Sequence, residues 1–318
     1  MPNQNSYEYS RDEYLYLKKS FFKDLKEEDD TICIYGNLKK IYLDDFLALN
    51  DKEKRLISTR YLANLRKQKE SDIDYLLYTN NNLDVDSING LLFNIKTKND
   101  DFKINSNLLF PHNALNILLA LSIIDTLGLF NKEIFNDLIN SINILGRDEV
   151  IKYNGRTIIV SNTCSYHLEH LKKYQERGEI NKIRLVTGSL GYGFSTWCEQ
   201  YKCDKFNEYV NTSMKYIYKD INAYVDKVYI TSIDNGKMDP QELIDNQIKE
   251  LNKDKEYYSN IDRKETIRKA ISESYNGDVI FISGRGNREI FCKSEIDVDY
   301  FKDMDIVKEA IKELKKLE

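Results

Sequence analysis

The stretch GDVIFISGRGNREIF, residues 277 to 291, decides how the second half of this chain folds. An apolar run from Val279 to Ile282 ends at Ser283, and glycines, a cation, an amide and an acid follow at once. An apolar run of this length is typical of a buried strand in an open α/β sheet, where the residues after the strand reach the ligand. We therefore expect a functional loop directly after this strand.

Apolar runs of the same kind alternate with amphipathic helices in the residues before this stretch. Strands of nearly continuous Ile and Val that alternate with helices indicate a mainly parallel sheet covered on both faces. The sequence thus predicts an α/β fold with a Rossmann-like C-terminal domain. Its expected strands are RTIIVS (156–161), KIRLVTG (182–188), KVYITS (227–232) and DVIFISG (278–284).

The first part of the chain has a less regular pattern. Residues 42–65 look largely helical, and a strongly apolar helix follows Pro111. Because regular alternation starts only beyond Gly146, we place a domain boundary between residues 1–144 and residues 145–318. The strands expected in the first domain are TICIY (31–35), DYLLYT (74–79), GLLFNIKT (90–97) and DDFKINS (100–106), the last two paired as a hairpin.

Length and composition limit the function classes. The 318 residues suffice for two domains, and 41% hydrophobic with 31% charged residues predicts a folded chain. The net charge of −5, with both signs spread along the chain, provides no basic stripe, so we expect no nucleic-acid partner. No apolar run is long enough for a bilayer and the amino terminus has no signal-peptide core, so we expect a cytoplasmic protein without a membrane partner.

Cysteines and histidines give no clear metal set. The five cysteines are odd in number and scattered, which fits reduced intracellular thiols. Cys198 and Cys203 form a close pair with no second pair after it. His167 and His170 stand three apart and could share a helix face, but we interpret them as solvent-exposed and expect no metal.

Polar loops follow the four expected strands, and carboxyl ends of parallel strands meet at one edge of a sheet. The last two loops combine groups that could hold a zwitterion, with its carboxylate on Lys237 or Arg285 and its amino group on Glu289 or Asp234. A solvated loop surface is the alternative. The loops are SNTCSY (161–166), GSLGYGFST (188–196), SIDNGKMDP (232–240) and SGRGNREIF (283–291).

The glycines of GSLGYG suggest a dinucleotide fingerprint only weakly, because their spacing is not GxGxxG. A tight strand-to-helix turn explains them more simply. A nucleotide-dependent oxidoreductase is therefore the least favoured interpretation.

Taken together, these loops resemble the C-terminal part of the Mur ligase family, nearest to the type that adds the third, diamino-acid residue to the peptidoglycan peptide. The family's DNPR-type motif is matched by residues 234–237, DNGK. Its GKGHE-type motif is matched by Gly284-Arg285-Gly286-Asn287, with Arg288 inserted before Glu289. Further matches are PHNALNILLALSII (111–124) to the HNxxN helix, LGRDE (145–149) to the GRxE entry of the last domain, and DEYLYLKKSFF (12–22) to the helix with a carbamylated lysine.

The resemblance implies the fold and the site residues. Residues 1–144 would be a remnant of the family's central ATPase domain, without the preceding UDP-binding domain and the P-loop half, and residues 145–318 its C-terminal domain. The family's activity is ATP-dependent formation of an amide bond through an acyl phosphate. The implied roles are Lys18 as the catalytic carbamylated lysine, Asn113 beside adenine, Arg147 near phosphate or ribose, and Asp234, Asn235, Lys237, Arg285 and Glu289 around an amino acid.

Departures from the family pattern lower the expectation of activity. The sequence contains no GxxxxGK[ST], and Ser161 replaces the aspartate that meets the nucleotide ribose. Gly236-Lys237 replaces the prolyl-arginyl pair, and Asn287 replaces the histidine. Because phosphoryl transfer depends on positioned cations and P-loop amides, we expect this chain alone not to use ATP.

Two hypotheses remain. In the first, the chain is half of a split ligase of peptidoglycan-precursor synthesis. A P-loop-containing protein, or a homo-oligomer, would cover its open first domain, and ATP and Mg²⁺ would be cofactors only with such a P-loop. In the second, it is a catalytically dead pseudo-ligase that serves as a binding or regulatory module without a cofactor. Either would bind a small amino acid or peptide precursor.

Overall fold

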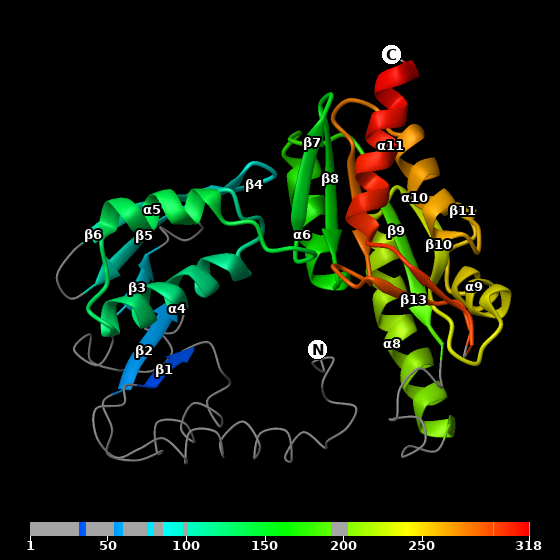
Figure 1. The fold of residues 1–318 in the computed structure, drawn as a ribbon, viewed down its shortest axis with the longest axis horizontal. Coiled ribbons are helices and arrows are strands. Elements are labelled where there is room, and N and C mark those ends of the chain that lie inside the picture. The colour runs from blue at the N-terminus through cyan, green and yellow to red at the C-terminus, as the bar shows by residue number, and fades with distance from the viewer. Residues whose placement is uncertain are drawn as a thin grey trace. The chain divides into compact units, whose positions relative to one another are not determined.

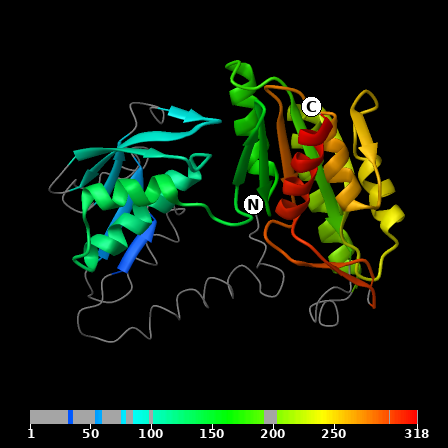
Figure 2. The same cartoon turned by 45° about the horizontal axis from the view of Figure 1, so that its top comes forward.

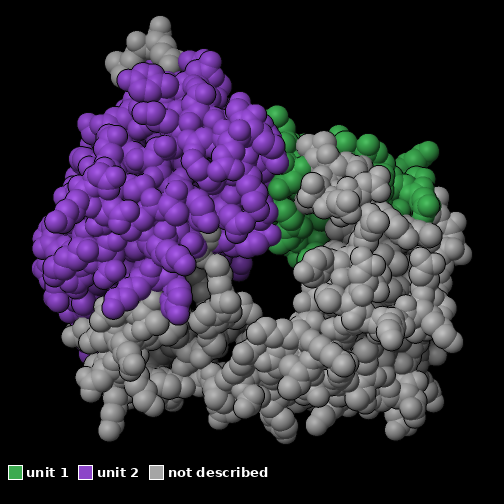
Figure 3. Space-filling view, turned by 180° about the vertical axis from the view of Figure 1, so that it is seen from behind, with its two compact units in different colours: residues 1–142 green, residues 143–318 purple. Residues whose placement is uncertain are grey.

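The structure of the protein is a computed structural model that describes residues 32–35, 54–59, 75–78, 85–97, 101–191, 203–294 and 296–317. The chain divides into two compact units, unit 1 at residues 1–142 and unit 2 at residues 143–318 (Figure 3). The boundary drawn from the sequence lies after residue 144. Lys18 and the helix expected around it lie outside the described residues.

Unit 1 contains a mixed six-stranded sheet with one parallel side. Three parallel strands lie next to each other, and β5 pairs antiparallel with the third of them. β5 also pairs antiparallel with β4 and with β6. The strands are β1 Ile32–Tyr35, β2 Lys54–Thr59, β3 Tyr75–Tyr78, β4 Val85–Ser87, β5 Gly90–Thr97 and β6 Asp101–Ser106 (Figure 1).

The prediction of a largely helical segment at 42–65 was wrong at β2. The strand KRLIST pairs in parallel with β1 on one side and with β3 on the other. Ile57 and Thr59 are β-branched, and a short apolar run next to a polar helical pattern cannot be assigned from periodicity alone. Pairing with two strands decides the conformation here.

Two helices are described in unit 1. α4, His112–Thr126, contacts β1, β2, β3 and β5, and α5, Lys132–Ser141, packs on β6. α5 begins where the Asn131 side chain accepts a hydrogen bond from the Ile134 N–H at 3.1 Å. Apolar side chains of β5, β6 and both helices form one core, whose members include Leu91, Phe93, Ile95, Phe102, Ile104, Ala114, Ile117, Leu118, Leu121, Phe135 and Ile139.

Unit 2 is built on a second six-stranded sheet, and its mainly parallel order confirms the predicted α/β fold. The strand order is β11-β10-β9-β12-β8-β7, and only β7 runs antiparallel to its neighbour. The strands at both edges, β7 and β11, were not expected. The strands are β7 Glu149–Tyr153, β8 Arg156–Ser161, β9 Ile183–Leu190, β10 Lys227–Asp234, β11 Glu256–Ser259 and β12 Val279–Ser283.

Helices cover both faces of this sheet (Figures 1 and 2). Ile280 and Ile282 of β12 belong to the core under α10 and α11, whereas the alternate Phe281 lies 5.4 Å from the His167 ring of α6, centroid to centroid. A short antiparallel hairpin, β13 Ile290–Cys292 with β14 Val298–Tyr300, follows β12. The helices are α6 Ser165–Glu176, α8 Cys203–Tyr224, α9 Pro240–Ile248, α10 Arg263–Ser272 and α11 Asp303–Leu317.

An ionic network lies at the amino-terminal ends of the central strands, opposite to the loops that follow these strands. The Tyr229 hydroxyl donates to Glu273 at 2.7 Å, and the Lys227 ammonium lies 3.0 Å from the same carboxylate. Burial alone would raise the pKa of Glu273, but hydrogen bonds from Tyr229, Lys227 and Lys269 lower that pKa to about 2. This network stabilises the amino edge of the sheet and leaves the carboxyl edge for ligands.

Among the described helices, none is long and apolar enough to cross a membrane.

Candidate functional site

The loops after β8 and β12 meet at the carboxyl edge of the unit 2 sheet, as expected for parallel strands. The Gly284 N–H donates to the Ser161 carbonyl at 3.0 Å. On the other side of β12, the Gly191 N–H after β9 donates to the Asp234 carbonyl at the end of β10, at 2.8 Å. The rest of the β9 loop, residues 192–202, lies outside the described residues.

Two glycine motifs within unit 2 are in direct backbone contact. Gly146 and Gly286 both have positive φ, at +66° and +57°. A Cβ on Gly146 would collide with the backbone of Asn287, and a Cβ on Gly286 would collide with the Gly146 carbonyl oxygen. Glycine is required at both positions by conformation and by space. The turn before β7 and the loop after β12 are therefore held together at the sheet edge.

Asp234 is the last residue of β10 and is fully buried, whereas the sequence placed it in a loop. Its Oδ2 accepts a hydrogen bond from Arg288 Nη1 at 2.8 Å, and its Oδ1 accepts one from the Cys292 N–H at 3.1 Å. Burial raises the pKa of the Asp234 carboxyl, and the Arg288 charge opposes that rise. Both carboxylate oxygens are therefore bound by groups of the chain itself.

Arg285 is also fully buried, and it does not extend into solvent. Its Nη1 lies 3.3 Å from Asp303 Oδ1, and its Nη2 donates to the Ile290 carbonyl at 2.9 Å. Its guanidinium carbon lies 4.9 Å and 4.5 Å from the ring centroids of Phe291 and Phe301. Burial lowers the pKa of Arg285, and the Asp303 carboxylate opposes that shift.

Arg263 shares the same carboxylate with Arg285. Arg263 Nε donates to Asp303 Oδ1 at 2.9 Å, and its Nη2 donates to Oδ2 at 2.7 Å, a bidentate pair. The same Nη2 donates to the Ser283 carbonyl at 2.9 Å at the end of β12. All three charged side chains are completely buried. This arginine–aspartate–arginine cluster fixes the loop after β12 against α10 and α11.

The remaining amino-acid candidates lie around this cluster. Asn235 is buried, and its Nδ2 donates to the Lys293 carbonyl at 3.0 Å. Lys237 and Glu289 are exposed, and the Glu289 carbonyl accepts a backbone hydrogen bond from the Phe301 N–H at 2.9 Å. The structure thus brings Asp234, Asn235 and Arg285 to one side of the sheet edge as buried residues, with Lys237 and Glu289 at the surface of their loops.

The nucleotide candidates lie in different units. Asn113 of α4 in unit 1 is buried, its Nδ2 donates to the Leu109 carbonyl at 2.6 Å, and its Oδ1 accepts from Asn116 Nδ2 at 3.0 Å. The amide therefore fixes the start of its own helix. Arg147 is exposed in the turn before β7 of unit 2, and its backbone N–H donates to the Ile144 carbonyl at 3.0 Å.

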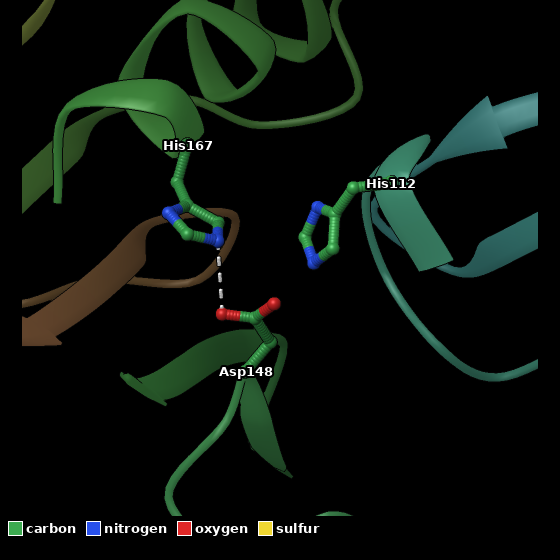
Figure 4. Close-up of side chains that lie close together, drawn as sticks. All are labelled: His112, Asp148 and His167. Atoms are coloured by element: carbon green, nitrogen blue, oxygen red, sulfur yellow. Dashed lines mark ion pairs between the residues drawn. The ribbon is translucent and has the colours of Figure 1, made fainter. Parts of the chain in front are cut away.

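A second polar group lies at the carboxyl end of β8. The prediction that His167 is solvent-exposed was wrong, because its face of α6 packs on the sheet and the side chain is almost completely buried. His167 Nδ1 lies 3.3 Å from the Thr163 hydroxyl oxygen, and His167 Nε2 lies 3.0 Å from Asp148 Oδ1 (Figure 4). Periodicity of α6 could have placed His167 inside, but the pairing with Asp148 has no sequence signal.

Comparison with known proteins gives local sequence matches and a fold match. No protein-family model matches the chain. A UDP-N-acetylmuramyl-tripeptide synthetase of Ligilactobacillus salivarius is 32% identical over 99 residues, which are 30% of this chain and 19% of that protein. A UDP-N-acetylmuramoyl-L-alanyl-D-glutamate--2,6-diaminopimelate ligase of Oceanobacillus iheyensis is 33% identical over 93 residues, 28% of this chain and 18% of that protein.

Two solved structures share the fold. A UDP-N-acetylmuramoyl-L-alanyl-D-glutamate--2,6-diaminopimelate ligase aligns with a TM-score of 0.57 and 19% identity, over 96% of this chain and 57% of that one. MurF from Acinetobacter baumannii aligns with a TM-score of 0.61 and 9% identity, over 95% of this chain and 56% of that one. These two sequence relatives and these two structures are Mur ligases.

The Mur ligase resemblance read from the short motifs is therefore confirmed, and so is the α/β fold. The chain spans a little over half the length of the solved Mur ligases, at 57% and 56%, and its matched segments span about a fifth of the curated ones, at 19% and 18%. The identities with the solved structures, 19% and 9%, support the fold and not the roles of individual residues.

Proposed function

We propose that this Mur-ligase-like chain does not catalyse amide-bond formation, that its amino-acid site is closed by its own arginines, and that it serves binding or regulation. One observation carries the proposal. Asp234 and Arg285, the acid and the cation that the resemblance places around an amino acid, are both fully buried and bound within the chain.

The energies favour the closed arrangement over binding of a free amino acid. Withdrawing Arg285 would break its contact with the Asp303 carboxylate and its hydrogen bond to the Ile290 carbonyl, and hydrogen bonds made by a charged group contribute roughly 1.5–3 kcal/mol each. A ligand with a dissociation constant of 1 mM gains only about 4 kcal/mol. A small metabolite at ordinary concentration would therefore not open this site through Arg285.

The described residues at the expected nucleotide site also support a chain that does not form amide bonds. The Asn113 side-chain amide is occupied at the start of α4, and Ser161 stands in place of the ribose-binding aspartate of the family pattern. The described residues do not fit an ATP–Mg²⁺ site, and we derive no step through these groups.

A second candidate function is one half of a split ligase. Among the described strands of unit 1, β1 pairs only with β2 and is parallel to it. A parallel edge strand can be extended by a strand from another polypeptide, which in this hypothesis brings the P-loop, ATP and Mg²⁺. The amino acid would then have to displace Arg288 from Asp234.

Ligation assays separate the two functions. The purified chain is incubated with ATP, Mg²⁺, UDP-N-acetylmuramoyl-L-alanyl-D-glutamate and 2,6-diaminopimelate, and ADP and the tripeptide product are measured. We expect neither. ADP and product from the pure chain would refute the non-catalytic proposal. Product that appears only after a P-loop protein co-purifies from the source cells would establish the split ligase instead.

A further inference from the structure

A chain of four polar side chains crosses the carboxyl end of β8. The Ser161 hydroxyl oxygen lies 3.3 Å from that of Thr163, which lies 3.3 Å from His167 Nδ1. His167 Nε2 in turn lies 3.0 Å from Asp148 Oδ1 (Figure 4). All four residues belong to unit 2. A hydroxyl, an imidazole and a carboxylate in this order form the arrangement that activates a nucleophile.

The acid determines which way the hydrogen bonds run. With its proton on Nε2, the nitrogen that lies 3.0 Å from the Asp148 carboxylate, the imidazole presents Nδ1 to Thr163 as an acceptor. In this tautomer Nδ1 accepts from the Thr163 hydroxyl, and the Thr163 oxygen then accepts from the Ser161 hydroxyl. The Thr163 hydroxyl therefore faces a base that can take its proton.

The backbone around Asp148 holds the acid in place. Asp148 has φ +57°, in the left-handed region, and its side chain is 7% exposed. The neighbouring turn is fixed by the Gly146 N–H, which donates to Glu149 Oε2 at 2.9 Å. A non-glycine residue in this region is strained and persists where surrounding contacts enforce it.

Access and competition both favour Thr163 as the reactive group. Thr163 is exposed, whereas Ser161, His167 and Asp148 are shielded from solvent. The adjacent Cys164 is the other nucleophile nearby, but burial raises the pKa of its thiol to about 12, so it stays protonated at neutral pH. α6 begins at Ser165 without a side-chain cap on its first turn, so its N–H groups supply positive potential next to Thr163.

We propose that Thr163 is a base-activated nucleophile that accepts an acyl group from an activated ester, with His167 as general base and Asp148 as the residue that positions it. The Thr163 oxygen attacks the ester carbonyl while its proton moves to His167 Nδ1. The tetrahedral intermediate expels the alcohol, which takes that proton, and an acyl-threonine forms. Water attacks the acyl-threonine with the same base, releases the acid and restores the hydroxyl.

The test uses the whole chain and p-nitrophenyl acetate as the probe. Release of p-nitrophenol is followed, and the acetylated residue is located by mass spectrometry after acid quench. Thr163→Val, which keeps the shape and removes the hydroxyl, should abolish the protein-dependent rate and the label. Thr163→Ser should stay within about tenfold of the wild type, and His167→Gln should lose about 100-fold or more.

Asp148→Asn tests positioning, and we expect a loss of about tenfold or more in the acylation rate with the affinity for the ester unchanged. Ser272 is the control, because its exposed hydroxyl donates to the Lys269 carbonyl and has no base beside it, and it should stay unlabelled. Acetylation confined to lysines, or equal rates in wild type and Thr163→Val, would overturn the proposal. Thr163 is exposed, so both of its variants should fold. They therefore decide the test even if the variants at the buried His167 and Asp148 unfold. The outcome is independent of the proposed non-catalytic role in amide ligation.

Discussion

Replacing Asp303 by Asn tests the buried cluster beneath the candidate site. Asp303 accepts from Arg263 at 2.9 Å and 2.7 Å and lies 3.3 Å from Arg285, with all three side chains completely buried. Asn keeps the shape of the side chain and removes its charge. Two guanidinium groups would then share one buried site without an anion between them.

The expected loss in the free energy of unfolding is about 3–5 kcal/mol, the usual cost of removing one partner from a buried ion pair. This is a large part of the roughly 5–15 kcal/mol that stabilises a typical domain. The corresponding fall in melting temperature is on the order of 10 °C. Surface charge pairs contribute under about 1 kcal/mol, so the loss of a buried ion pair is easily distinguished from the loss of an exposed one.

Urea unfolding followed by far-ultraviolet circular dichroism measures the loss, and hydrogen exchange in β12 and α11 assigns it to unit 2. Glu309→Gln is the matched control, because Glu309 lies on the same helix and pairs with Arg268 at 2.8 Å while 54% exposed. We expect the control to lose less than about 1 kcal/mol. If Asp303→Asn loses no more than the control, the buried cluster does not stabilise the carboxyl edge as argued.

Three further predictions concern backbone, charge and pH. Gly146→Ala should destabilise by more than about 2 kcal/mol in thermal melts, whereas Gly178→Ala, with similar φ but open space around it, should lose only about 1 kcal/mol. Arg288→Ala should lose about 2 kcal/mol in urea at pH 7 and less as the pH is lowered, because burial raises the pKa of Asp234 and protonation neutralises the carboxyl that Arg288 leaves unpaired. The carboxylate of Glu273, 30% exposed, has a folded-state pKa of about 2 against a reference of 4.5, so its stabilisation is present above pH 4.5 and is lost as pH falls toward 2. Glu273→Gln should flatten that acid dependence, and an unchanged pH profile of unfolding would contradict the network.

The central sheet of unit 2 was predictable because its strands are continuous apolar runs. β8, β9, β10 and β12 all contain such runs, and helices separate them in sequence. β7 was missed although Asn154-Gly155, both with positive φ, is a hairpin signal that joins it to β8. β11, EYYS, is too short and polar to be read as a strand, and it forms because β10 offers an open edge.

The candidate site was predictable in its location and not in its contacts. The carboxyl edge follows from parallel strands, which is why the loops after β8 and β12 meet. The pairing of Arg263 with Asp303 joins residues 40 positions apart, and no local pattern marks it. Arg288 was visible as an insertion, but only the fold shows that its guanidinium fills the space beside Asp234.

The position of Asp303 as the first residue of α11 affects how the chain is made. Residues 263 and 285 leave the ribosome before residue 303, so both arginines are exposed on the nascent chain until α11 brings its acid. The carboxyl edge of unit 2 is thus completed only after residue 303 has been made. A premature stop before residue 303 would leave nearly all strands intact and still produce an aggregation-prone chain.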